Sequence, residues 1–334
     1  MKIIDLPNSR GIKKPLYLAL GNFDGVHRGH QAVIGTAVRL ARGDGGSAAA
    51  LLFDPHPSVL LRPQKHFCLL TGIEERAALL EQLGLDCIFV VPFDARTAAL
   101  PPEDFVRQVL LEQLQVSGVS IGFDYSFGCG GTGKEEQMQA YGRKMGFTVA
   151  VSPLERDSGG IISSSAVKKV LAEGAVKQVA RLLNYYFFRR GEVVSGRGRG
   201  KKVLYPTANL KPDPGLAWPG GGVYLTAVGG LDGPIHFGLT NVGVKPTFGD
   251  DLLTVETYIL DFTGELYGRS ITLYFLERLR DTLNFASPAL LREQIDLDIT
   301  RGRELARTCY GSIDAFVEPV HFIRPSKELF YICD

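Results

Sequence analysis

The sequence predicts a two-domain protein, in which an α/β domain is followed by an all-β domain that ends in a helix. The chain has 334 residues, which corresponds to roughly two domains of about 100–200 residues each. Up to about residue 184, short apolar runs alternate with segments of helical periodicity. After about Arg190, glycine and proline separate short β-rich runs that have no helices between them. We therefore expect domains at residues 1–184 and 185–304, followed by a tail of unknown role at residues 305–334.

The composition is that of an ordinary soluble globular protein, with 45% hydrophobic and 22% charged residues. Thirty-seven Lys and Arg offset 36 Asp and Glu, which leaves a net charge of +1. Proteins that bind nucleic acids or membrane surfaces usually carry a large basic excess. We therefore expect neither nucleic acid nor membrane among the partners.

The five cysteines include no C-x-x-C pair and no neighbouring histidine at metal-ligand spacing. This pattern favours reduced thiols in a cytoplasm over a disulfide framework or a zinc site. The N-terminus lacks the uninterrupted apolar core of a signal peptide, and no apolar run approaches the ~18 residues needed to span a bilayer. A cytoplasmic location is expected.

The first half contains the pattern of a parallel sheet with helices on both faces. Thr71 to Glu74 is a candidate capping box for one helix, and Pro101 and Pro102 open another. In such sheets, ligands bind at the carboxyl ends of the strands. The expected strands are Leu16–Leu20, Ala48–Phe53, Cys87–Val91, Gly118–Gly122 and Phe147–Val151.

The second half favours an antiparallel barrel or sandwich, because its strands are separated by turn signals alone. Ser287 is a good N-cap and Pro288 a good first residue for one following helix. Residues 309–334 fit neither half. The expected strands are Gly191–Val194, Val223–Val228, Ile235–Asn241, Thr254–Leu260 and Ile271–Leu276.

A glycine-containing turn with two histidines follows the first of the predicted strands. Gly21 and Gly25 allow a tight turn and a close approach to a ligand, and His27 and His30 fall on one side of a first helical turn. The N-terminus of that helix attracts anions, so the arrangement suits the triphosphate of ATP. The alternative is a pair of ordinary histidines, which the ten-residue context disfavours.

The motif G-x-F-D-G-V-H-x-G-H at residues 21–30 resembles the nucleotidyltransferase module of bacterial bifunctional riboflavin kinase/FAD synthetases. Phe53–Pro57, Gly122–Gly128 and Ile162–Lys168 follow in the same order as in that family. The resemblance implies a Rossmann-like domain at residues 1–184 that transfers AMP from ATP to FMN and releases pyrophosphate.

The resemblance also implies roles for particular residues, with His27 and His30 as catalytic contacts to the ATP phosphates. Flavin and ATP would meet a loop region that contains Asp54, His56, Asp124 and Phe127. The implied ATP-binding residues are Gly21, Phe23, Asp24, Gly25, His27, His30, Ser163, Ser164, Ser165 and Lys168.

Three positions depart from this family pattern, because Ser126, Gly131 and Lys168 stand where arginine is usual. Lysine keeps the charge but loses the bidentate fork that suits phosphate. A riboflavin kinase with a weakened or inactive adenylyltransferase half is therefore an alternative.

A second candidate phosphate site spans residues 191–209. Its glycine loop can surround phosphates with backbone N–H groups, and Thr207 and Asn209 offer oxygen ligands suited to Mg²⁺. The alternatives are a solvated loop and an RNA-binding segment, and one short copy in a near-neutral chain disfavours the RNA reading. The loop residues concerned are Gly196, Gly198, Arg199, Gly200 and Lys201.

This half resembles riboflavin kinase, through G-E-V-V-x-G-x-G-R-G and P-T-A-N and through later segments that begin at Gly222, Asn241, Val255 and Leu266. The resemblance implies a six-stranded barrel with a C-terminal helix, in which ATP phosphorylates riboflavin. Thr207 and Asn209 would hold Mg²⁺, and Glu256 would be the general base. Arg280 and Phe285, with Glu256, would bind the flavin. Leu204, Tyr205 and Tyr258 depart from the usual pattern.

Taken together, these features predict a monomer or weak homo-oligomer that uses ATP and Mg²⁺ to make FMN from riboflavin and FAD from FMN. The glycine run at residues 128–134 spells two phosphate-loop patterns, but Glu135 stands where a Walker loop needs Ser or Thr. A flavin-binding regulator without activity and a generic cytidylyl- or pantetheine-type transferase are the rival hypotheses.

Overall fold

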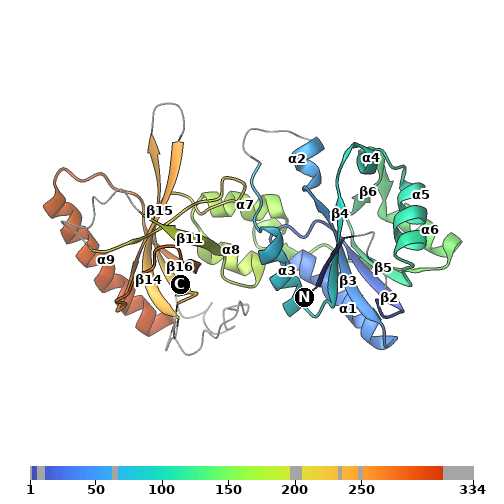
Figure 1. Cartoon of the computed structure of the whole chain (residues 1–334), viewed down its shortest axis with the longest axis horizontal. Coiled ribbons are helices and arrows are strands. Elements are labelled where there is room, and N and C mark those ends of the chain that lie inside the picture. The colour runs from blue at the N-terminus through green and yellow to red at the C-terminus, as the bar shows by residue number, and fades with distance from the viewer. Residues whose placement is uncertain are drawn as a thin grey trace. The chain divides into compact units, whose positions relative to one another are not determined.

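The chain folds into two compact units, Met1–Ser164 and Ser165–Asp334 (Figure 1). A computed structural model describes residues 2–5, 12–61, 67–195, 205–231, 235–246 and 251–310. The units divide before the expected boundary at residue 184, because α7 (Ser164–Ala172) and α8 (Val176–Leu183) pack with the second unit. In that packing, α8 contacts a barrel strand, and the Gly220 amide donates to the Leu171 carbonyl at 2.9 Å.

The first unit is built on a six-stranded sheet in which every neighbouring pair is parallel. The five strands expected from the sequence are confirmed to within one residue at each end. The edge strand β1 was not predicted, because its four residues carry too short a pattern. In spatial order the strands are β1 (Lys2–Asp5), β4 (Cys87–Pro92), β3 (Ser47–Asp54), β2 (Leu16–Leu20), β5 (Gly118–Gly122) and β8 (Thr148–Ser152).

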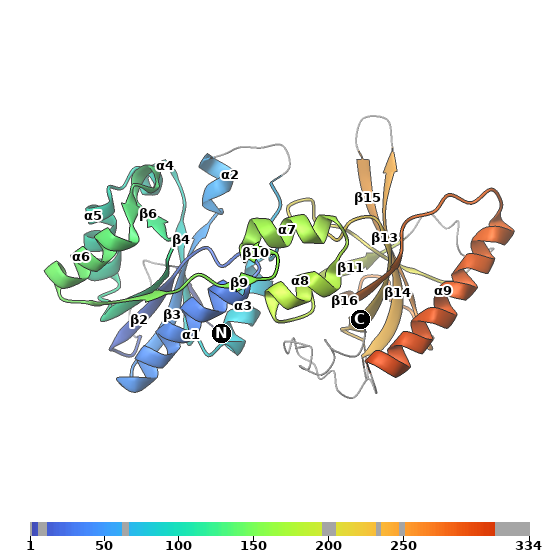
Figure 2. The same ribbon diagram turned by 180° about the vertical axis from the view of Figure 1, so that it is seen from behind.

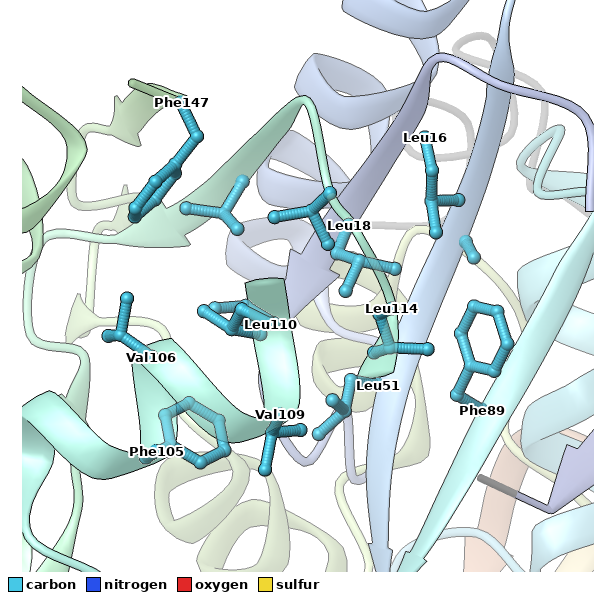
Figure 3. Close-up of a cluster of buried hydrophobic side chains, with 14 of the residues drawn as sticks. Leu16, Leu18, Leu51, Phe89, Phe105, Val106, Val109, Leu110, Leu114 and Phe147 are labelled. Atoms are coloured by element: carbon cyan, nitrogen blue, oxygen red, sulfur yellow. The ribbon is translucent and has the colours of Figure 1, made fainter. Parts of the chain in front are cut away.

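Helices cover both faces of this sheet, as the sequence predicts. The π-type helix η2 (Phe105–Gln113) packs its apolar side chains against Leu16, Leu18 and Phe89 (Figure 3). Helix α1 (Arg28–Gly43) contacts β2, β3 and β5 and buries Val33, Ile34, Ala37 and Ala41. Both faces of the central strands are thereby removed from water, which explains their almost continuous apolar sequence.

Helix α3 (Ile73–Gln82) begins one residue later than the predicted capping box indicates. Gly72 is the N-cap, and the Glu75 carboxylate accepts a hydrogen bond from the Gly72 amide at 3.0 Å. The expected Thr71–Glu74 box is therefore wrong, because the Thr71 hydroxyl is engaged elsewhere by the Gly25 amide.

Short elements complete the first unit. The glycine run at residues 128–134 lies in a hairpin, which supports rejecting it as a Walker or dinucleotide loop. The remaining elements are α2 (Pro57–Leu61), α4 (Ala95–Ala98), α5 (Pro102–Asp104), β6 (Ser126–Phe127), η3 (Cys129–Gly131), β7 (Gly133–Lys134), α6 (Glu135–Met145), β9 (Arg156–Asp157) and β10 (Gly160–Ile161).

The second unit is a closed antiparallel barrel with a long helix along its outside, which decides between the barrel and the sandwich (Figure 2). Helix α9 (Pro288–Cys309) contacts β14, and the Ser287 hydroxyl caps it by accepting from the Leu290 amide at 3.3 Å. In barrel order the strands are β11 (Phe188–Val194), β12 (Ala208–Leu210), β15 (Asp251–Ile259), β14 (His236–Pro246), β13 (Gly222–Gly229) and β16 (Ser270–Arg280).

Three threonine hydroxyls form a hydrogen-bonded chain inside the barrel. Thr240 lies 2.9 Å from both Thr226 and Thr257, measured between hydroxyl oxygens, and all three residues are fully buried. Thr226 also donates to the Gly238 carbonyl at 3.1 Å, so the chain ends on a satisfied partner. This inward placement of Thr257 puts its neighbour Glu256 on the outer face of the barrel.

Three of the cysteines, Cys68, Cys87 and Cys129, are free thiols. Among the described residues, no helix is both long enough and apolar enough to cross a membrane.

Two helix glycines give a matched test of the packing. A Cβ at Gly142 in α6 would lie 2.6 Å from Val149 Cγ2 and 2.8 Å from the Phe147 carbonyl oxygen, whereas a Cβ at Gly35 in α1 meets nothing within 4 Å. We expect Gly35→Ala to stabilise the first unit by about 0.5–1 kcal/mol and Gly142→Ala to destabilise it by about 1–3 kcal/mol. Denaturant unfolding of both variants measures the change in the free energy of unfolding. Equal changes in the two variants would contradict the packing at α6.

Candidate active sites

The motif at residues 21–30 lies at the point where the order of the first sheet reverses. From β2 the chain proceeds to β3 and β4 on one side and then returns to β5 on the other. The segments that follow β2 and β5 therefore leave the same edge of the sheet as neighbours. This switch point is where open parallel sheets bind ligands, and both Gly21–His30 and Asp124 lie in the segments that leave it.

The turn between β2 and α1 has an unusual backbone. Phe23 and Val26 have φ angles of 50° and 41°, in the left-handed region that costs non-glycine residues conformational energy. Gly25 has φ +78°, and a Cβ at this position would also lie 2.6 Å from Leu70 Cδ1. Glycine is therefore required at position 25 for both conformation and space.

His27 and His30 lie against each other, which confirms that their imidazoles share one side of the first turn. The ring centroids are 3.6 Å apart and the planes are inclined by only 19°. His27 is the N-cap of α1, and its Nδ1 accepts a hydrogen bond from the His30 amide at 3.3 Å. The edge of Phe23 meets the His30 ring at 5.3 Å.

Both imidazoles are neutral at pH 7. Burial lowers the pKa of His27 from 6.5 to about 4, although Asp24 and Asp124 oppose that shift. Burial, with the adjacent His27 and the Arg76 guanidinium, holds the pKa of His30 well below 6.5. Because Nδ1 of His27 is an acceptor, its proton resides on Nε2, which is therefore a hydrogen-bond donor. A helix N-terminus with such a donor is suited to an anion.

Asp24, expected to bind ATP, is buried and not exposed to a ligand. Its Oδ1 accepts from the Leu70 amide at 2.7 Å and the Thr71 amide at 3.2 Å. The Ser164 hydroxyl donates to the Asp24 carbonyl at 2.8 Å. The carboxylate therefore joins the turn to the segment before α3.

The predicted serine-rich segment is divided between the two units. Ser163 and Ser164 belong to the first unit, with Ser164 in contact with Asp24. Ser165 and Lys168 lie on α7 in the second unit.

The predicted flavin loop is only partly composed of exposed side chains. Asp54 and Asp124 are exposed at the ends of β3 and β5. His56 Nδ1 accepts from the Ser58 amide at 3.1 Å at the start of α2. Phe127 is only 5% exposed and packs into the hydrophobic cluster, whereas Phe123, which sequence reasoning missed, is 59% exposed. Its position directly after a parallel strand is the signal that identifies it.

Ser126 and Gly131, two of the positions where arginine is usual in the family, lie close together in space. Gly131 has φ +64°, and a Cβ there would lie 3.5 Å from the Ser126 hydroxyl oxygen. The positive φ disfavours any larger side chain at position 131. Ser126 and Gly131, which stand where arginine is usual, therefore lie at a tight turn of the β6–β7 hairpin.

In the second unit, strand register brings three polar residues into one row. Glu256 in β15 is directly opposite Asn209 in β12 on one side and Asn241 in β14 on the other. Val255 and Thr257 are buried in the barrel, so Glu256 lies on the outer face, where it is half-buried. Asn241 was not among the predicted site residues, although it lies in a segment that carries the resemblance.

Thr207 lies two residues before Asn209, which belongs to this row, and both side chains carry an oxygen that could bind a cation. The Asn209 side-chain amide donates to the Thr207 carbonyl at 3.3 Å. Hydroxyl, amide and carboxylate oxygens are the ligand types that Mg²⁺ prefers. Among the described residues, no group of three His, Cys, Asp or Glu side chains could hold a metal. Gly196, Gly198, Arg199, Gly200 and Lys201 lie outside the described residues.

Arg280, predicted to bind flavin, forms an ion pair with α9. Its Nε lies 3.0 and 2.9 Å from the two Asp298 carboxylate oxygens, and Nη2 lies 2.7 Å from Oδ2. The guanidinium carbon is 5.9 Å from the Phe285 ring centroid. Arg280 therefore fixes α9 to β16 and lies close to Phe285.

Two departures from the family pattern in the second unit, Tyr205 and Tyr258, also touch, whereas Leu204 lies outside the described residues. The rings of Tyr205 and Tyr258 have centroids 4.9 Å apart, and the Tyr205 hydroxyl donates to Asp296 of α9 at 2.5 Å. Tyr205 precedes Thr207 by two residues, so this contact joins the start of the Thr207–Asn209 segment to β15 and α9.

Comparison with known proteins identifies both halves. A family model described as FAD synthetase matches residues 9–166, and one described as riboflavin kinase matches residues 183–306. Two curated relatives carry the name bifunctional riboflavin kinase/FMN adenylyltransferase. The Listeria monocytogenes protein is 37% identical and covers 84% of this chain and 89% of its own length. The Escherichia coli K12 protein is 34% identical, with 86% and 91% covered.

A solved structure has the same fold over both units. The crystal structure of a Streptococcus pneumoniae protein, described as a macrolide-efflux protein, gives a TM-score of 0.81 at 28% identity. The likeness covers 92% of this chain and 99% of that chain.

The low pKa of His27 predicts a loss of stability in mild acid. The unfolded chain binds the His27 proton below pH 6.5 and the folded chain only near pH 4, so stability falls as the pH is lowered through this window, by up to about 3 kcal/mol. His27→Asn keeps an N-cap acceptor but cannot titrate. We expect denaturant unfolding of the variant to depend less steeply on pH between 6.5 and 4 than that of the wild type, and equal slopes would contradict the assignment.

Proposed function

Because the chain belongs to the family of bifunctional riboflavin kinase/FMN adenylyltransferases, we propose that each of the two residue clusters described above is the site of one half-reaction. The chain is a riboflavin kinase and an FMN adenylyltransferase, with ATP as co-substrate of both reactions. The alternative of a kinase with an inactive first half is not favoured, because the curated relatives carry both activities in their names. The observation that carries the proposal is the convergence of Asn209, Glu256 and Asn241 in the second unit alongside the stacked His27 and His30 in the first.

At the adenylyltransferase site, the first turn of α1 binds the phosphates of ATP. The Nε2–H of His27 and the free backbone amides of the helix donate to phosphate oxygens, and His30 lies stacked behind His27. As FMN attacks the α-phosphate, negative charge grows on the pyrophosphate that leaves. Fixed donors stabilise this charge without needing to gain a proton from solvent.

The flavin of FMN takes the edge of the sheet next to this turn. Phe123 offers an exposed ring there, and we assign it the aromatic contact that the sequence assigned to the buried Phe127. Asp54, His56 and Asp124 border the same edge, since they follow β3 and β5. Ser163, Ser164, Ser165 and Lys168 are proposed as the second phosphate-binding segment.

At the kinase site, Glu256 accepts the proton of the riboflavin 5′-hydroxyl as that oxygen attacks the γ-phosphate of ATP. Asn209 and Asn241 flank it across the strands, so neutral amides surround the carboxylate. Thr207 and Asn209 would hold Mg²⁺, which neutralises charge on the transferred phosphoryl group when it is bound. Arg280 and Phe285 border the flavin, and residues 196–201 contact the ATP phosphates.

We propose further assignments that rest on composition and family membership. Residues 1–184 and 185–304 are the functional domains, and α7 and α8 are the last helices of the first in sequence. The enzyme works in the cytoplasm as a monomer or weak homo-oligomer, without nucleic acid or membrane, which fits a net charge of +1.

Glu256→Gln tests the kinase site. The amide keeps the size and polarity of the carboxylate but cannot accept the hydroxyl proton, so we expect riboflavin phosphorylation to fall by about 10²-fold or more in kcat. FMN adenylylation by the same protein should remain near the wild-type rate. Separate assays of FMN and FAD formation measure this, and a variant that keeps wild-type kinase turnover would contradict the role of Glu256.

His27→Asn and His30→Asn test the adenylyltransferase site. Loss of one fixed donor to a developing charge typically costs about 10²–10³ in kcat, and we expect at least the lower value for His27. Pyrophosphate release from ATP and FMN reports the reaction. Riboflavin phosphorylation is the internal control, since it should be unaffected, and equal loss of both activities would contradict separate sites.

The pair Thr207→Val and Asn209→Leu tests the magnesium site. Both substitutions keep approximate size but remove the oxygen ligands, so we expect the Mg²⁺ concentration for half-maximal kinase activity to rise about tenfold or more. Mn²⁺ binding in the presence of ATP, followed by electron paramagnetic resonance, should weaken in parallel. Unchanged metal dependence in the double variant would place the ion elsewhere.

A further inference from the structure

We propose that Thr71 and Arg76 are positioning residues for adenylyl transfer, because they hold the left-handed turn that carries His27 and His30. The proposal rests on the proposed function of those two histidines. Thr71 lies just before α3 and Arg76 lies in its first turns, and both are far from the β2–α1 turn in sequence. Neither has a predicted role in binding, and Thr71 was expected only to cap its own helix.

Thr71 makes the central contacts. Its hydroxyl oxygen accepts from the Gly25 amide at 3.0 Å, and its own amide donates to Asp24 Oδ1 at 3.2 Å. Two successive residues of the turn are therefore bound to one threonine. The Thr71 hydroxyl is available for this because Gly72, and not Thr71, is the N-cap of α3.

Arg76 is a second buried side chain that bonds to the turn, and we call Thr71 and Arg76 together the clamp. Its side chain is 3% exposed, which is rare for arginine. Nη1 donates to the Asn22 carbonyl at 3.0 Å, Nη2 donates to the Thr71 carbonyl at 2.9 Å, and Nε lies 3.4 Å from the Thr71 hydroxyl oxygen. One planar group thereby fixes the start of the turn to the threonine that holds its middle.

The turn needs this external support. Phe23, Gly25 and Val26 all have positive φ, and a residue in a sparsely populated conformation persists only where its surroundings over-determine it. The Val26 amide bonds back to the Phe23 carbonyl at 3.0 Å, but the Gly25 amide donates to the Thr71 hydroxyl, outside the turn. Since Val26 directly precedes the N-cap His27, a change at Gly25 is transmitted to the paired imidazoles.

Matched substitutions of threonine test this mechanism. Thr71→Val keeps the shape but removes the hydroxyl acceptor, whereas Thr71→Ser restores it. Thr97→Val is the control, because Thr97 is half-buried and lies away from the turn, where its hydroxyl donates to the Pro92 carbonyl. We expect Thr71→Val to lower kcat for FAD formation about tenfold or more, Thr71→Ser to stay within about threefold of wild type, and Thr97→Val to be unchanged.

Two readouts separate positioning from general stability. Riboflavin kinase activity of the same chain should be unaffected in all three variants. Hydrogen exchange at the Gly25 amide should accelerate in Thr71→Val and stay protected in Thr71→Ser, since only the serine variant keeps the acceptor. A Thr71→Ser variant as defective as Thr71→Val, or a Thr71→Val variant with wild-type FAD formation, would overturn the proposal.

Arg76→Met provides an independent test of the same clamp, with Arg107→Met as its exposed control. If Arg76 and Thr71 act as one unit, the loss of kcat in the double variant will be smaller than the product of the single losses. Multiplicative losses would overturn the joint role. Failure of the proposed function is a separate result: His27→Asn with full FAD formation would refute that function, whereas Gly25 exchange would still report on the clamp.

Discussion

The backbone hydrogen bonds of the β2–α1 turn are the constraint on which the first site depends. A chain that turns from a buried strand into a helix within a few residues leaves backbone groups that need partners from elsewhere in the fold. Here the Gly25 amide donates to the Thr71 hydroxyl and the Asn22 carbonyl accepts from Arg76, while Asp24 of the turn itself accepts from the Leu70 amide. The geometry of the proposed adenylyltransferase site is consequently a property of a three-dimensional network and not of the glycine-containing motif alone.

In the barrel, the positions of the candidate site residues are set by strand pairing and not by side-chain contacts to a turn. A closed sheet fixes the register of every strand against two neighbours, so the placement of Glu256 between Asn209 and Asn241 follows from backbone pairing. The buried threonine chain of Thr226, Thr240 and Thr257 adds side-chain bonds across β13, β14 and β15, and the last two of these strands carry Asn241 and Glu256. A one-residue slip would exchange the inward threonine with the outward glutamate, so register and function are specified together.

Much of the fold was predictable from the sequence because its signals are local. The five apolar strands, the histidine pair and the Ser287 cap follow from periodicity and residue type. The edge strand β1 and the three-residue β12 were missed because they are too short to carry a pattern. The use of Thr71 by Gly25, the burial of Phe127 and the row containing Asn241 arise from tertiary contacts, which no local pattern encodes.

The contact between Tyr205 and Tyr258 has a consequence for engineering this enzyme. Two positions that differ from the common pattern of related chains are in van der Waals contact, so each is part of the environment that selects the other. Consensus design, which exchanges unusual residues one at a time, would therefore pass through a mismatched intermediate here. Tyr205, Tyr258 and Asp296 should therefore be exchanged together when residues are transferred between homologues.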